Sequence, residues 1–352
     1  MSCDKPQPNK ALILNALRGK RNPNRNDQLT VLCKVSLILL FLSACSPVGT
    51  APIKAWRHAA GGAYAANISA DSSLAVVSSV NNGISVWNLV TNEKLYEWQH
   101  QGEGNNLVLN IHIAFDNSFV VTSDRETFAL WNLAAGEPEG FWRIDESSIR
   151  DVAVTNQGQG ILVGRGNGKV MYFEPSTGRR LEFLGHQEKV NSVDISPNGF
   201  YALTGGNDYV AYLWDTRSGQ VMHKFTHPSR VTKVVLDDEG RFAFTADSKR
   251  QARVWDLTTG KEVSRLQYFA RQKIFSTAIF SEDGLYLLTG SPSRRMNLWR
   301  VADGRELHQW QVTAREGSRP QSAVVYGLGF VNNNEIVSES SSGLAEFWRV
   351  DD

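Results

Sequence analysis

Short runs in which apolar and polar residues alternate recur along most of this chain of 352 residues. Each run lasts four to six residues, and many of the runs end on an aromatic residue. Strict alternation over this length is typical of a β-strand with one buried face. No part of the repeated region keeps the period of an amphipathic helix. The pattern therefore predicts an all-β fold.

The aromatic residue that closes one of these runs returns at a regular interval. Seven runs share this feature, and their aromatic residues are Trp87, Trp131, Phe173, Trp214, Trp255, Trp299 and Trp348. The spacings between them are 44, 42, 41, 41, 44 and 49 residues. A nearly fixed period of this kind indicates seven copies of one supersecondary unit.

Turn residues divide each unit into strands. The segments Ser196–Gly199 and Asp237–Gly240 separate two alternating runs, and Thr216–Gly219 and Leu257–Gly260 separate two more. Glycine at the end of such polar clusters is a common sign of a tight turn between strands. We therefore expect each unit to be a four-stranded antiparallel sheet, with strands a, b, c and d in chain order.

The fourth unit has the fullest pattern, with His186 before its first strand, Thr204 in the second, Asp208 in the next turn and Trp214 followed by Asp. This pattern resembles the WD-repeat (beta-transducin repeat) family, and the resemblance extends from about Ile53 to the end of the chain. It implies a propeller with seven blades around a central channel. It also implies that these four residues form a buried structural network. A base, a hydroxyl and a carboxylate could instead form a nucleophilic triad, but we favour the structural interpretation.

A second aromatic series predicts how the ring closes. Its members in strand d are Trp98, Trp142, Phe183, Phe225, Tyr268 and Trp310, and Trp56 precedes Trp98 by 42 residues. The last unit ends four residues after Trp348 and so lacks a strand d. An exposed sheet edge would remain there. We therefore expect Ile53–His58 to be the outer strand of the seventh blade.

The N-terminal segment has a different composition from the repeats. Residues 1–30 are polar and basic, the run Val35–Leu42 is almost wholly apolar, and Leu42–Cys45 follows it. This order resembles the signal peptide and lipobox of bacterial lipoproteins, which implies cleavage before Cys45 and lipid attachment to its sulfur. The apolar run is far shorter than the roughly 20 residues of a membrane-spanning helix. The alternative is a buried strand that ends in a chance cysteine.

These features predict three regions. Residues 1–44 are a signal peptide with an over-long N-terminal extension, residues 45–51 are the lipidated cysteine and a short linker, and residues 52–352 are the propeller. The extension suggests that translation begins near Val31 or Leu32. Ser46 after the cysteine resembles lipoproteins sent to the outer membrane, so we expect a protein anchored in the bacterial envelope, in the outer rather than the inner membrane, that faces the periplasm.

Composition excludes several kinds of site. The net charge is +1, which argues against a generally polyanionic partner such as nucleic acid. The cysteines are Cys3, Cys33 and Cys45, so the propeller itself has neither a disulfide nor a thiolate metal site. No common catalytic motif is present, and we expect no cofactor and no metal.

Charge is unevenly distributed over the loops. The loops from d to a and from b to c in blades five to seven contain a group of cations that we take as candidate partner-binding residues: Lys249, Arg250, Arg271, Lys273, Arg294, Arg295, Arg315 and Arg319. Acidic residues gather in the turns of the opposite face. Such a basic sector could dock an acidic protein or anionic lipid headgroups, or the cations could simply be solvated.

The sequence thus favours a lipid-anchored, monomeric scaffold that binds unidentified protein partners without catalysis. One alternative is an envelope assembly factor. Another is a small-ligand-binding or enzymatic propeller that uses the mouth of its channel, where His112 and Asp194 occupy matching positions in strand a of the second and fourth blades.

Overall fold

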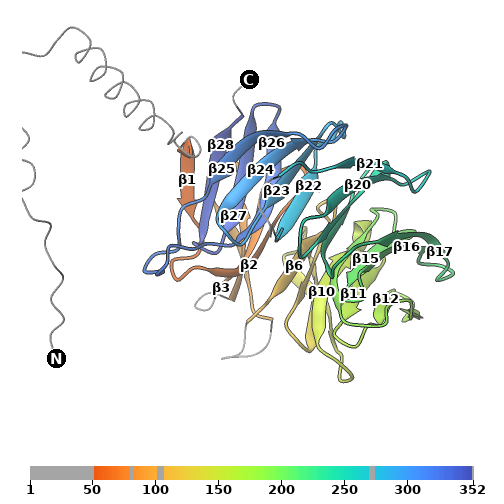
Figure 1. The fold of residues 1–352 in the computed structure, drawn as a ribbon. Helices are drawn as coiled ribbons and strands as arrows, with labels where there is room; N and C mark the ends of the chain where they lie inside the picture. Colours follow the sequence, from red (N-terminus) through yellow and green to blue (C-terminus); the bar gives the residue numbers. More distant parts are fainter. Residues whose placement is uncertain (1–50, 80–82, 101–106, 269–273, 351–352) are drawn as a thin grey trace, which may run out of the picture. The chain divides into compact units, whose positions relative to one another are not determined.

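The computed structural model describes residues 51–79, 83–100, 107–268 and 274–350, and residues 49–352 form one compact unit. Its strands form seven four-stranded antiparallel sheets (Figure 1). The one helical segment in the described part is the short 3₁₀ turn η2 (Asn156–Gly158). The expectation of an all-β propeller with seven blades is confirmed.

The first four blades follow the chain in order, from strand a to strand d. Blade one contains β2 (Ala63–Ile68), β3 (Leu74–Ser79), β4 (Gly83–Asn88) and β5 (Lys94–Trp98). Blade two contains β6 (Asn110–Ile113), β7 (Phe119–Ser123), β8 (Thr127–Asn132) and β9 (Glu137–Arg143). Blade three contains β10 (Ile149–Val154), β11 (Ile161–Arg165), β12 (Val170–Phe173) and β13 (Arg180–Phe183). Blade four contains β14 (Val190–Ile195), β15 (Tyr201–Gly206), β16 (Val210–Asp215) and β17 (Val221–Thr226).

The last three blades continue the series. Blade five contains β18 (Val231–Leu236), β19 (Phe242–Asp247), β20 (Ala252–Asp256) and β21 (Glu262–Arg265). Blade six contains β22 (Thr277–Phe280), β23 (Tyr286–Gly290), β24 (Arg295–Arg300) and β25 (Glu306–Gln311). Blade seven contains β26 (Val325–Asn332), β27 (Glu335–Ser340) and β28 (Leu344–Arg349), with β1 (Lys54–Arg57) as its outer strand.

Blade seven is completed by the start of the propeller chain, as expected from the aromatic spacing. Strand β1 pairs antiparallel with β28, with Trp56 opposite Ala345 and Lys54 opposite Phe347. The backbone N–H groups of Ile53 and His58 extend the ladder to the carbonyls of Phe347 and Gly343 at 2.8 and 2.9 Å. Figure 1 shows orange β1 beside blue β28. Main-chain hydrogen bonds therefore join the two ends of the ring.

The hydrophobic core lies between the blades. The first strands contact one another around the ring, from β2 through β6, β10, β14, β18 and β22 to β26, and β26 contacts β2 again. Each interface between neighbouring blades, here called a seam, contains one buried apolar cluster. Each sheet therefore buries both faces, which is why its middle strands are almost continuously buried.

Aromatic rings of strand d stack on the strand-c aromatic of the following blade. Trp98 stacks on Trp131 with ring centroids 4.8 Å apart, and Phe183 stacks on Trp214 at 4.6 Å. The expectation that Tyr268 belongs to this register was wrong, because Leu266 bonds to Ala252 at the equivalent place and Tyr268 follows two residues later. Tyr268 still meets the next blade edge-on, so the spacing identified the contact but not the register.

Candidate interaction site

The loops from d to a and the turns from b to c share one face of the propeller. Backbone hydrogen bonds join them in several blades, for example from His227 N–H to the Tyr209 carbonyl at 2.8 Å and from Val312 N–H to the Arg294 carbonyl at 2.9 Å. The a–b and c–d turns are joined in the same way on the opposite face, as between Thr216 and Phe200 at 3.0 Å. In these blades the loop after strand d and the b–c turn therefore lie on one face, and the a–b and c–d turns lie on the other.

Six of the eight candidate cations lie in the described residues, and we call the surface that carries them the basic face: Lys249, Arg250, Arg294, Arg295, Arg315 and Arg319. Arg294 is half-buried and the other five are exposed. Arg271 and Lys273 lie outside the described residues, as does Cys45. None of the six forms an ion pair within the part of the chain that the structure describes.

Two arginines of the basic face are held by backbone carbonyls rather than by acids. Arg294 donates through Nε to the Val312 carbonyl at 2.9 Å, and Arg315 donates to the Gly61 carbonyl at 2.9 Å. A carbonyl positions a guanidinium without neutralising its charge. These two side chains are thus positioned at the surface and still offer a positive charge to a partner.

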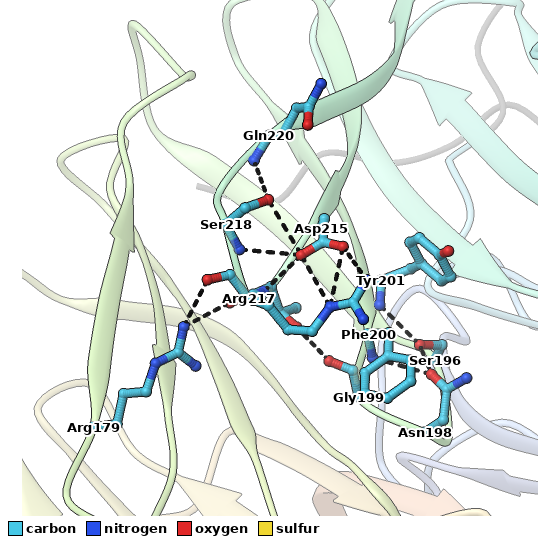
Figure 2. Close-up of polar contacts among 11 residues, drawn as sticks. Arg179, Ser196, Asn198, Gly199, Phe200, Tyr201, Asp215, Arg217, Ser218 and Gln220 are labelled. Carbon is cyan, nitrogen blue, oxygen red and sulfur yellow. Dashed lines mark hydrogen bonds and ion pairs between the residues drawn. The ribbon is translucent and has the colours of Figure 1, made fainter.

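Arginines of the opposite face have a different environment. Arg241 pairs with Asp237 at 2.7 Å, Arg300 with Asp303 at 2.6 Å, and Arg217 with Asp215. Figure 2 shows Arg217 folded back over Asp215 in the c–d turn of blade four. Arg179 of blade three donates to the backbone carbonyl of Arg217 at 2.9 Å. The contact with the Arg217 guanidinium lowers the pKa of Asp215 to about 2. These three arginines are therefore paired with acids of their own face.

The four network residues of blade four are close together in the structure. His186 contacts Asp208 at 3.0 Å through Nδ1 and Thr204 at 2.9 Å through Nε2. Burial alone would raise the pKa of Asp208, but hydrogen bonds from His186 and nearby backbone N–H groups lower it. The indole nitrogen of Trp214 has no hydrogen-bond partner among the described residues, so the expected last link is not seen.

Blade five, the next blade, does have the hydrogen bond from the tryptophan indole to the threonine. Trp255 donates to Thr245 at 2.7 Å, and Thr245 contacts His227 at 2.8 Å. Thr204 and Thr245 are both fully buried, so a substrate could not reach their hydroxyls. The arrangement fits a structural network and does not fit a nucleophilic site, which needs an accessible hydroxyl.

His112 in β6 of blade two and Asp194 in β14 of blade four lie close together, although blade three stands between their blades. His112 Nε2 lies 3.7 Å from Asp194 Oδ1. Both side chains also accept backbone hydrogen bonds, His112 from Val154 N–H at 3.2 Å and Asp194 from Leu236 N–H at 2.7 Å. The two therefore tie neighbouring blades together. Among the described residues no group of three or more histidine, cysteine or acidic side chains is placed to hold a metal ion.

Sequence reasoning missed two features. Tyr209 and Arg294 sit in equivalent b–c turns at a φ of 69°, a backbone region that favours glycine. His58, which follows Trp56 by two residues, is buried and contacts Glu339 in β27, the second strand of blade seven. The two-residue offset from His227 to Phe225 and from His100 to Trp98 was the available sign that His58 belongs to the histidine series. No helix in the described ranges is long and apolar enough to span a membrane.

Comparison with known proteins agrees with the repeat pattern. The model of the family described as "WD domain, G-beta repeat" matches residues 178–215 and 219–256. Each match covers the outer strand of one blade and the first three strands of the next.

Fungal proteins described as "Polyadenylation factor subunit 2" are similar over a short stretch. Those of two strains of Cryptococcus neoformans var. neoformans serotype D are 30% identical over 92 residues, which are 26% of this chain and 13% of each relative. The Candida albicans protein is 29% identical over 96 residues, 27% of this chain and 18% of the relative. The matched stretch spans less than a fifth of each relative. Together with the seven blades, the matched repeats support a WD-repeat propeller for this chain.

Proposed function

We propose that this chain is a non-enzymatic scaffold for protein interaction whose basic face docks an acidic surface of a partner protein. The observation that carries the proposal is the contrast between cations of the two faces. The six cations of the basic face form no ion pair among the described residues, whereas Arg217, Arg241 and Arg300 of the opposite face are each paired with an aspartate. Unpaired surface charge of one sign increases the rate and selectivity of association with the opposite sign.

The backbone beneath the basic face favours such a role. Interblade hydrogen bonds and one packed cluster per seam hold the loops on a rigid support. Preorganised loops lose little conformational entropy on binding. Arg294 and Arg315 are additionally held by carbonyls, so their positions are fixed before a partner arrives.

The N-terminal segment completes the proposal. We place the scaffold as a monomer on the bacterial envelope through a lipid on Cys45, in the outer membrane and facing the periplasm. The support is the order of basic stretch, apolar run and lipobox-like residues in the sequence. The fungal relatives are named for polyadenylation, but a match of 92 residues is about two repeats long, so we carry over the repeat and not that role.

The docking proposal is tested by reversing charge on the basic face. The variant K249E/R250E/R295E/R319E avoids Arg294 and Arg315, which make structural bonds. The control R180E/K224E/K261E/R305E changes the net charge equally at exposed positions outside the basic face. The probes are a ten-residue glutamate peptide and vesicles of phosphatidylglycerol, with binding measured as a function of salt.

The proposal expects the wild type and the control to bind the acidic peptide and the basic-face variant to bind at least tenfold more weakly. Binding to the vesicles alone would assign the face to lipid, and equal binding by both variants would contradict the proposal. The anchor is tested separately, since Cys45→Ser should move the protein from the membrane fraction to the soluble fraction. Retention of that variant in membranes would exclude a lipid on Cys45.

A further inference from the structure

Other seams of this propeller have a small residue at one position of strand b, such as Ser78, Gly205 or Ala246. In two of them this residue is a glycine packed against valines of the next blade. Gly205 in strand b of blade four faces Val231 and Val234, and a Cβ built on it would lie 2.6 and 2.8 Å from their methyl groups. Gly164 stands in the same relation to the valines of β14. No side chain fits at this position while the valines are present, because real Cβ contacts are longer than 3.0 Å.

The seam between blades seven and one departs from this rule. Glu339 pairs with Ala345 as Gly205 pairs with Ala211, so a glutamate occupies the position of the small residue. Ala63 and Ala66 occupy the positions of the two valines. They pair with the same two positions of strand b that Val231 and Val234 pair with in blade five. The alanines give up the volume that the glutamate side chain needs.

The buried glutamate is met by a histidine that follows the closing strand. His58 Nδ1 forms a hydrogen bond with Glu339 Oε1, and both side chains are completely buried. The His58 ring stacks on Trp87 of blade one at 4.5 Å, the contact that Trp98 or Phe183 makes in other seams. His58 lies between β1 and β2 in the chain, so it links blade one to the strands of blade seven that hold β1 only through the ladder to β28.

The direction of His58 has a cause in blade one. His100, His186 and His227 each bond to a threonine hydroxyl in strand b of the blade that follows them. Val77 occupies this threonine position in blade one, opposite Ser85, so His58 finds no hydroxyl there. Its Nδ1 therefore forms a hydrogen bond with Glu339 of blade seven, the preceding blade, and its Nε2 contacts Asn92 at 3.3 Å.

We propose that His58 and Glu339 form a latch that selects the chain's own N-terminal strand for the open edge of β28 and makes this seam the point where the ring opens first. Apart from its ladder to β28 and the edge-on contact of Trp56 with Phe347, β1 buries little surface, because Lys54, Ala55 and Arg57 are exposed. Glu339 Oε2 has no hydrogen-bond partner in the described residues. Any strand that lacked a histidine at this place would leave the whole carboxylate buried without a partner, which is strongly unfavourable.

This inference goes beyond the proposed function and does not depend on it. It concerns which segment occupies the edge of blade seven. The matched control lies in the same blade, because Glu346 is also a fully buried glutamate but faces blade six, where the Thr313 N–H donates to it at 3.0 Å. A general effect of a buried acid and a specific effect at the closing seam can therefore be separated.

Amide hydrogen exchange of the full-length protein tests the latch. In Glu339→Ala and His58→Ala, the amides of residues 53–59 should exchange about 100-fold faster, while those of β5 in an ordinary seam change less than threefold. Glu346→Ala should instead accelerate residues at the seam between blades six and seven. An equal acceleration in all outer strands, or none at residues 53–59, would overturn the proposal.

A repacked seam gives the second test. The variant E339G/A63V/A66V replaces the latch with the glycine and valines of ordinary seams, and E339Q keeps the shape but removes the carboxylate. The repacked variant should close with β1 amides that exchange as slowly as those of β5, whereas E339Q should be faster than wild type. If the repacked variant fails to close while E339Q matches the wild type, the pair is not a latch and the proposal is wrong.

Discussion

Two bulky residues adopt backbone angles that glycine adopts elsewhere in the same turn. Tyr209 and Arg294 have a φ of 69°, and Gly168 and Gly343 hold the equivalent places in blades three and seven at 86° and 75°. A non-glycine residue in this region is unfavourable by about 1 kcal/mol or more. This conformational strain therefore lies in two b–c turns, on the same face as the loops from d to a.

Replacement of Tyr209 by glycine should therefore stabilise the protein. The side chain is 51% exposed, so its loss removes little packing. We expect the free energy of unfolding to rise by about 0.5–1 kcal/mol, because relief of the strain exceeds the extra entropy of glycine in the unfolded chain. Urea denaturation measures the change, with Tyr209→Phe as the control that keeps both strain and ring. A less stable glycine variant would mean that the tyrosine ring contributes to the fold.

Asp238 offers a second test at the level of one residue. Its carboxyl lies in the turn after β18, and desolvation by the neighbouring protein together with the nearby Asp194 and Asp237 raises its pKa to about 7. The folded protein therefore holds a proton that the unfolded chain releases near pH 4. Stability should fall as the pH rises from about 4 to 7, and the deficit should persist above pH 7.

The variant Asp238→Asn should remove this deficit. The residue is also exposed to solvent, so screening limits the gain to about 1 kcal/mol or less at pH 8. Below about pH 4 the variant and the wild type should unfold at the same urea concentration. Thermal or urea unfolding at both pH values measures the difference, and a gain of the same size at pH 3.5 would show that charge is not the cause.

Sequence patterns could identify network residues but not all of their partners. His186, Thr204 and Asp208 were recognisable because each lies at a fixed place in a repeat, and His186 contacts the other two in the structure. Glu339 gave no such sign, since its role depends on which residue faces it across a seam. That relation follows from register between segments far apart in the chain, and alternation alone does not fix it.

At the level of the strand, β1 is the element on which ring closure depends. Its ladder to β28 and the buried ring of His58 are the contacts that the other blades obtain from their own strand d. The aromatic spacing predicted this pairing because Trp56 keeps the register of the outer strands. It could not predict that His58, two residues later, takes over the stacking role, because side-chain direction at a strand end depends on the neighbouring blade.

Deletion of residues 46–58 should therefore destabilise the whole propeller and not only its first residues. The loss exposes the edge of β28 and leaves Glu339 without His58. We expect a fall of several degrees or more in the melting temperature, measured by circular dichroism. A chain that begins at residue 46 is the control, because it retains the strand and should melt like the full-length protein. Equal melting of both truncated chains would contradict the assigned closure.

For the molecule as a whole, the two faces differ in how their charges are used. The sequence predicted the basic and acidic sectors from loop positions, but it could not show that acids of the opposite face are committed to turns. Asp215 accepts hydrogen bonds from the N–H groups of Arg217 and Ser218 at 2.8 and 3.1 Å, and Asp303 accepts one from Arg305 at 3.1 Å. Such bonds favour the ionised carboxylate.

The acidic face should consequently contribute to the loss of stability in acid. The pKa of Asp215 is lowered from its ordinary value near 3.8 to about 2, chiefly by the Arg217 guanidinium, and those of Asp71 and Asp303 are lowered as well. A lowered pKa contributes stability that is present above about pH 4 and is lost as the pH falls towards 2. Urea unfolding between pH 5 and 2 should therefore show a declining free energy of unfolding to which these carboxyls contribute.

The variant Asp215→Asn isolates one of these contributions. Asn88 and Asn132 occupy the same turn position in blades one and two and cap their turns through their amide oxygens, so the substitution preserves the local fold. At pH 7 the variant should be less stable than the wild type, because the contact with Arg217 loses its charge. The difference should shrink as the pH falls and vanish near pH 2, where the wild-type carboxylate is protonated too. A difference that stays constant over this range would mean that shape, not charge, makes Asp215 stabilising.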